Sequence, residues 1–244
     1  MGIFANPLTD LLEYEDFSRD FLKGTDPVGM TGCIDSEKVH FMSTFLGEKK
    51  VQLVVTYNEQ RAREIEEDYK LFCSQVYVIP PRDLIFFSAD LQGNAIIAER
   101  MKAFAALYQN EAKVIITTMD ALMSAAVPFE QLMSHVIKLK EGDELDLEKL
   151  KHDLTVMGYE RVGRVEEPGQ FTVHGGIADV YPLTMEVPVR IELWGDEIDT
   201  IRCFEPQSQR SMDQIECVSV FPAAEVIADD TARRRAVGMI QNEL

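Results

Sequence analysis

Apolar runs and helical stripes alternate along the chain from residue 51 to about residue 127. Three runs rich in β-branched residues predict strands at 51–56, 76–79 and 114–118. Because these runs are continuous, they are typical of strands covered on both faces, as in a parallel sheet. Asn58 is a plausible N-cap for the first of two helical stripes, which contain Ala62, Ile65, Tyr69 and Phe72, then Ile97, Met101, Phe104 and Tyr108. The pattern predicts a layered α/β domain over residues 1–127.

Pro128 and the acidic segment at 141–150 mark a change of pattern. A short helix follows, and its acidic, exposed start complements the helix dipole. The apolar face of this helix carries Leu147, Leu150, Leu154 and Met157. Strands interrupted by turn residues come next, which predicts a small α+β domain at 128–211 with an antiparallel sheet. Residues 212–244 are expected to begin a further, truncated subdomain that has a helix from Thr231 onward.

The strand expected at 189–194 alternates clearly. Val189, Ile191 and Leu193 point one way and predict the core face. Arg190, Glu192 and Trp194, the only tryptophan of the chain, point the other way. Trp and Arg are enriched at binding hot spots, so this face is a candidate protein-docking surface. The alternative is that Trp194 packs under the turn at 195–196.

The composition of the chain argues against DNA binding, membrane contact and metal binding. With 42 acidic against 24 basic residues, the net charge of −18 predicts that the chain repels duplex DNA overall. No apolar run approaches the roughly 20 residues that span a bilayer, and the acidic N-terminus is not a signal peptide, so we expect a cytoplasmic protein without membrane contact. The four cysteines and four histidines show no metal-ligand spacing, which predicts no metal site and buried, reduced thiols.

A family resemblance is most specific between residues 158 and 211. It rests on Pro168-Gly169, Gly175-Gly176, Asp179, Pro188-Val189-Arg190, Asp196-Glu197-Ile198 and Gln209-Arg210-Ser211. With these motifs the chain resembles the bacterial transcription-repair coupling factors, the Mfd family, and more distantly the excision-repair protein UvrB. Since Mfd proteins are several times longer, the chain resembles an N-terminal fragment. The resemblance implies a UvrB-like fold in which a degenerate P-loop NTPase-like domain precedes the α+β domain.

In this family the second domain binds UvrA and thereby recruits repair proteins to a stalled RNA polymerase in transcription-coupled nucleotide excision repair. The family positions for UvrA contact correspond to His174, Arg190 and Trp194 here. His174 stands where the family usually has arginine, and a neutral imidazole offers one donor instead of a fork of five. Either the partner has adapted, or His174 contributes less and becomes sensitive to pH. The resemblance also implies that the full-length protein contacts RNA polymerase and DNA. It further implies that a C-terminal domain of the full-length protein masks this face.

A phosphate loop of the form G-x-x-x-x-G-K-[ST] is degenerate here. Gly29, Gly32 and Ser36 fit, but Ile34 replaces the second required glycine and Asp35 replaces the lysine. A carboxylate ~4 Å from a phosphate repels it by roughly 4 kcal/mol at an effective dielectric near 20. We expect a non-binding relic loop at a strand–helix junction, no cofactor, no catalytic residue and no enzymatic activity in this chain. The resemblance places ATP only in C-terminal motor domains outside this sequence. The alternatives are a UvrB-like ATP-dependent damage-loading or DNA-unwinding fragment and a purely structural clamp on the motor.

Overall fold

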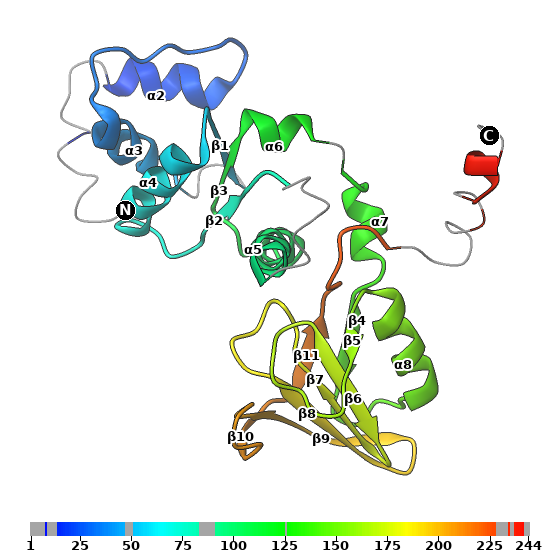
Figure 1. Ribbon diagram of the computed structural model, residues 1–244. Coiled ribbons are helices and arrows are strands. Elements are labelled where there is room, and N and C mark those ends of the chain that lie inside the picture. Colours follow the sequence, from blue (N-terminus) through cyan, green and yellow to red (C-terminus); the bar gives the residue numbers. More distant parts are fainter. Residues whose placement is uncertain are drawn as a thin grey trace. The chain divides into compact units, whose positions relative to one another are not determined.

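The computed structural model describes residues 8, 14–46, 51–82, 91–124, 126–227, 234 and 237–241, with backbone alone at 91–94. The chain divides into two compact units, Met1–Phe87 with Ala106–Ser124 and Ser88–Ala105 with Ala125–Leu244. The first unit contains α2 (Tyr14–Lys23), α3 (Asp35–Ser43), β1 (Gln52–Thr56), α4 (Glu59–Lys70), β2 (Val76–Ile79), β3 (Val114–Thr118) and α6 (Met119–Met123) (Figure 1).

The three strands of the first unit form a parallel sheet in the order β1-β3-β2, as the continuous apolar runs predict. Helix α4 begins at the predicted cap, where the Asn58 side chain accepts a hydrogen bond from the Arg61 N–H at 2.8 Å. Its buried face packs on alternate residues of the sheet; this core contains Ala62, Ile65, Tyr69, Val76, Val78, Val114 and Ile116.

The prediction that all three strands are buried on both faces is wrong for β1. All five residues of β3 are buried, because β3 lies between the other two strands. Strand β1 is at the edge of the sheet, and only its Val54 side packs on the α4 core. Leu53 and Val55 point the other way and are 60% and 40% exposed.

The second unit is built around a larger sheet. Helix α5 (Leu91–Tyr108) contributes its residues through Ala105 to this unit. The other elements are α7 (Phe129–Met133), β4 (Ile137–Lys140), α8 (Leu147–Val156), β5 (Glu160–Arg161), β6 (Gln170–His174), β7 (Ile177–Val180), β8 (Val189–Trp194), β9 (Glu197–Phe204), β10 (Ser211–Gln214) and β11 (Cys217–Val220).

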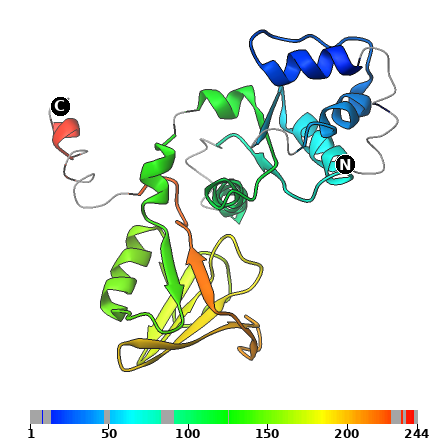
Figure 2. The same cartoon turned by 180° about the vertical axis from the view of Figure 1, so that it is seen from behind.

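Six strands pair in the order β10-β9-β8-β7-β6-β5, and β4 pairs with β11 in a separate two-stranded sheet (Figures 1 and 2). The pairs are antiparallel, as predicted, except that β5 runs parallel to β6. One face of the six-stranded sheet packs on α8 and the β4–β11 pair; this core includes Leu150, Leu154, Phe171, Val173, Val189, Ile191, Ile201, Val218 and Val220. The opposite face is called the outer face below.

The structure differs from the predicted domain boundary at residue 211. Strand β11 pairs with β4, and the Tyr159 hydroxyl donates a 2.7 Å hydrogen bond to the Phe221 carbonyl. Farther on, Glu225 forms a buried ion pair with Arg100 of α5. The second unit therefore extends beyond β10 to at least Glu225, because non-local strand pairing holds this segment. Of the helix predicted from Thr231 onward, residues 237–241 are helical, and Thr231 itself lies outside the described residues.

Candidate protein-docking surface

Strand β8 places the single tryptophan on the outer face. Val189 and Ile191 are fully buried in the core, as the alternation predicts, whereas Trp194 is 85% exposed. Trp194 is the last residue of the strand, and Gly195 turns the chain with a φ of +68°. The side chain therefore does not pack under this turn. An aromatic ring with this exposure has most of its apolar area available to a partner.

Arg190 lies on the same face but is held in place by its neighbours. Its Nε and Nη2 donate hydrogen bonds of 2.8 and 2.7 Å to the two carboxylate oxygens of Asp179 on β7. The guanidinium also lies 4.7 Å from the centre of the Phe204 ring, a cation–π contact. The hydrogen bonds to Asp179 raise the pKa of Arg190 above its ordinary value. Only 20% of the side chain is exposed, so Arg190 presents one edge of its guanidinium to solvent.

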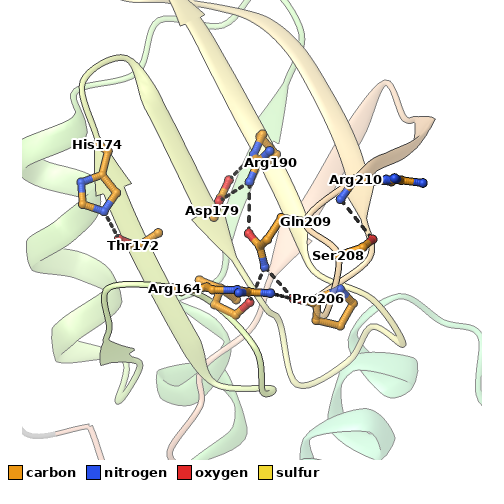
Figure 3. Close-up of polar contacts among 10 residues, drawn as sticks. Arg164, Thr172, His174, Asp179, Arg190, Pro206, Ser208, Gln209 and Arg210 are labelled. Carbon is orange, nitrogen blue, oxygen red and sulfur yellow. Dashed lines mark hydrogen bonds and ion pairs between the residues drawn. The ribbon is translucent and has the colours of Figure 1, made fainter.

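Gln209 links this arginine to two loops, a role that the sequence did not reveal. Its Oε1 is 3.4 Å from Nη2 of Arg190, and its Nε2 donates to the Pro206 and Val165 carbonyls at 2.7 and 3.1 Å (Figure 3). The residue has a φ of +60°, which is uncommon for a residue other than glycine. The Gln209-Arg210-Ser211 motif was a signal for it, but the motif alone does not show which side chain the glutamine contacts.

His174 is exposed at the end of β6, and its Nε2 is 2.9 Å from the Thr172 hydroxyl oxygen (Figure 3). Strand register aligns His174 with Ile177 of β7 and Ile177 with Glu192 of β8. The three residues predicted to contact UvrA therefore share the outer face. No hydrogen bond or ion pair among the described residues joins any two of them. Ile177, which is 40% exposed in the same row, adds an apolar residue that the sequence analysis missed.

The degenerate phosphate loop does not follow a strand as expected. It connects two helices, α2 and α3. The aromatic stripe of α2, formed by Tyr14, Phe17 and Phe21, packs on α3 and on the turn after it. Gly32 has a φ of +84°, and an added Cβ at Gly29 or Gly32 would meet no atom within 4 Å.

Two carboxylates occupy the start of α3, where a phosphate would bind. The Ile34 N–H donates to Glu37 Oε2 at 3.0 Å, and Asp35 lies 3.4 Å from both Lys38 and Arg61. Ser36 follows on an exposed turn of the helix. Glu37 thus accepts a backbone N–H at the start of the helix, and Asp35 adds a negative charge beside the positive end of the helix dipole.

The described residues contain no group of three or more His, Cys, Asp or Glu side chains arranged to hold a metal ion. Burial of the thiols was predicted and holds for Cys203, whereas Cys217 is exposed and Cys33 and Cys73 are half-buried. Within the described ranges, every helix is too short or too polar to cross a bilayer.

Comparison with known proteins agrees with these features. Residues 137–225 match the family described as UvrB interaction domain. The chain is 34% identical over 229 residues to the transcription-repair-coupling factor of Staphylococcus haemolyticus. The aligned region covers 92% of this chain and 19% of that protein. It is 31% identical over 246 residues to the same factor of Staphylococcus epidermidis, covering all of this chain and 20% of the relative. The chain carries a UvrB interaction domain and is a homologue of the transcription-repair-coupling factors.

It spans about a fifth of the length of the relatives it matches. The match to the UvrB interaction domain runs from β4 to the segment after β11; it lies within the second unit and extends past residue 211. All the residues of the outer face named above lie within it.

Proposed function

We propose that this chain is the UvrA-recruiting part of a transcription-repair coupling factor, acting in the cytoplasm in transcription-coupled nucleotide excision repair. The observation that carries this proposal is the 85% exposed Trp194 on the outer face of a UvrB interaction domain. A large exposed aromatic side chain beside a half-buried arginine is the composition that binding hot spots favour. The outer face serves as the docking surface.

The three residues have different roles in this proposal. Trp194 supplies apolar area that only a partner can bury. Arg190 supplies directed donors, since Asp179 and Phe204 fix the plane of its guanidinium. His174 supplies one donor at the edge of the surface, in place of the arginine of the family pattern.

No catalytic step is part of the proposal. The start of α3 holds Asp35 where a phosphate-binding loop needs lysine, so we infer that this chain binds no nucleotide and needs no cofactor. The first unit is then a degenerate NTPase-like domain, and its parallel sheet is consistent with that origin. We assign ATP-driven translocation, and contacts with RNA polymerase and DNA, to the full-length protein.

The direct test is calorimetric titration of UvrA from the same organism into the 244-residue chain and two variants. Arg190→Ala and Trp194→Ala should each weaken binding by about 2 kcal/mol, roughly thirtyfold. Leu71→Ala is the matched control, because Leu71 is 75% exposed in the other unit and should leave binding unchanged. Absence of binding by the unmodified chain would overturn the proposal.

ATP titration separates the proposal from the UvrB-like enzyme. We expect no binding heat at millimolar ATP, since Asp35 repels the phosphates and the basic side chains of Lys38 and Arg61 are already paired with Asp35. A dissociation constant in the micromolar range would show that the loop works and that a catalytic role has to be reconsidered.

A further inference from the structure

Arg202 of β9 lies directly opposite Arg190 of β8 in the antiparallel register. Its neighbours Ile201 and Cys203 face the core, so Arg202 points to the outer face. Across the sheet this row reads Thr172, Asp179, Arg190, Arg202 and Gln214. Two arginines therefore stand side by side on the surface that carries Trp194.

The row contains two cations, Arg190 and Arg202, but only one carboxylate, Asp179. Asp179 uses both of its oxygens to accept hydrogen bonds from Arg190. Among the described residues, no carboxylate forms an ion pair with Arg202, and its buried Nε has no hydrogen-bond partner. Arg202 therefore has no ion-pair partner among the described residues.

Two acidic side chains near this row have other partners. Glu192 accepts a 3.3 Å hydrogen bond from the Thr200 hydroxyl. Glu141 Oε1 accepts from the Gln214 side chain at 2.8 Å and from the Ile201 N–H at 3.4 Å. Neither carboxylate forms an ion pair with Arg202, although the net charge of the chain is −18.

The arrangement is unfavourable for the isolated chain. Like charges directly opposite each other destabilise a strand pair, and a buried donor without an acceptor costs further stability. An anion that approaches from outside the sheet reduces the repulsion between the two arginines, because a guanidinium forms charge-assisted hydrogen bonds with a carboxylate. An excess of acidic groups elsewhere in the chain makes an accidental cation pair a poor explanation.

We propose that Arg202 is an additional binding residue of the docking surface and receives an acidic side chain of the partner protein. This inference rests on the proposed function and names the chemistry of one of its contacts: a carboxylate placed beside the edge of Arg190. Phosphate of a nucleic acid is the other anion that two arginines attract, but the negative charge of the chain disfavours it.

The test combines affinity and stability in the 244-residue chain. Arg202→Met removes the charge and keeps a long apolar side chain. Its thermal midpoint should stay equal or rise, because the like-charge pair and the unpaired donor are gone. Its affinity for UvrA of the same organism should fall about tenfold, with a weaker dependence on salt. Arg202→Lys keeps the charge but loses the forked donors of the guanidinium, so its affinity for UvrA should lie between those of the unmodified chain and Arg202→Met.

Arg161→Met is the matched control. Arg161 is an exposed arginine of β5, at the opposite edge of the six-stranded sheet, and the substitution changes the net charge equally. It should leave affinity for UvrA unchanged.

The outcomes are distinct. If Arg202→Met binds UvrA like the unmodified chain while Trp194→Ala does not, the role of Arg202 is wrong and the docking surface stands. If the substitution lowers the thermal midpoint and leaves affinity intact, Arg202 is structural. If the unmodified chain fails to bind UvrA, both proposals fall. If a short DNA duplex binds the chain and Arg202→Met abolishes that binding, the anion is phosphate and the acidic-partner inference is overturned.

Discussion

At the scale of single residues, positions that look alike in the sequence have different physical roles. Arg190 and Trp194 both point outward from β8, yet one is fixed by Asp179 and Phe204 and the other is exposed. Alternation predicts the face of a side chain because a strand repeats every two residues. It does not predict the partner across the strand, which depends on register. The exposure of Trp194 was therefore predictable from the sequence, whereas the Phe204 contact was not.

Gly158 is a residue whose role only the structure shows. It follows α8 with a φ of +91°, and the Tyr159 N–H donates back to the Leu154 carbonyl at 3.0 Å, as in a Schellman cap. An added Cβ would lie 2.7 Å from the Ala224 Cβ and 3.2 Å from the Ala224 nitrogen. Backbone strain and overpacking together predict that Gly158→Ala lowers the free energy of unfolding by about 2–4 kcal/mol.

Urea unfolding measures this effect, and Gly163→Ala is its control. An added Cβ at Gly163 meets no atom within 4 Å, and its φ lies outside the left-handed region. The control should therefore stay within about 0.5 kcal/mol of the unmodified chain. Equal stability of the two variants would contradict the close approach of Gly158 to Ala224.

At the scale of elements, local periodicity predicted α4, α5, α8 and the parallel strands, since these signals are contained in short windows. The N-cap predicted at Asn58 is confirmed for α4, and the structure adds Asp146, whose side chain accepts hydrogen bonds from two N–H groups of α8. The pairing of β4 with β11 could not be predicted in the same way. The two strands are far apart in the sequence, and nothing in either of them specifies its partner. For this reason the predicted boundary at residue 211 left β11 outside its domain.

Truncation tests the contribution of this strand. A fragment of residues 88–211 lacks Val218, Val220 and Phe221, which are all buried. Burial of such side chains contributes about 1.5–3 kcal/mol each, and the sum is comparable with a typical domain stability of about 5–15 kcal/mol. We expect this fragment to lack a cooperative thermal transition by circular dichroism, whereas residues 88–227 unfold cooperatively. A cooperative transition in the shorter fragment would mean that β11 is dispensable.

At the scale of the whole molecule, each unit buries a tyrosine whose hydroxyl is hydrogen-bonded. Tyr69 donates to the Gln52 side chain at 3.0 Å in the first unit, and Tyr159 donates to the Phe221 carbonyl in the second. Burial raises the pKa of Tyr69 to about 12 and also raises the pKa of Tyr159 well above its ordinary value. Both units are therefore expected to lose stability under alkaline conditions by the same mechanism.

The direction follows from proton linkage. In the unfolded chain tyrosine deprotonates near pH 10, whereas the folded chain keeps these two protons to higher pH. The stabilisation is thus complete below about pH 10 and is lost as pH rises toward the folded-state pKa, about 12 for Tyr69. Urea unfolding at a series of alkaline pH values should show a steep fall in stability. Tyr159→Phe should reduce this slope and cost about 1 kcal/mol at neutral pH, where only the hydrogen bond is lost. Tyr57→Phe, at a 75% exposed position, should keep the full slope, and a slope for Tyr159→Phe equal to that of this control would refute the mechanism.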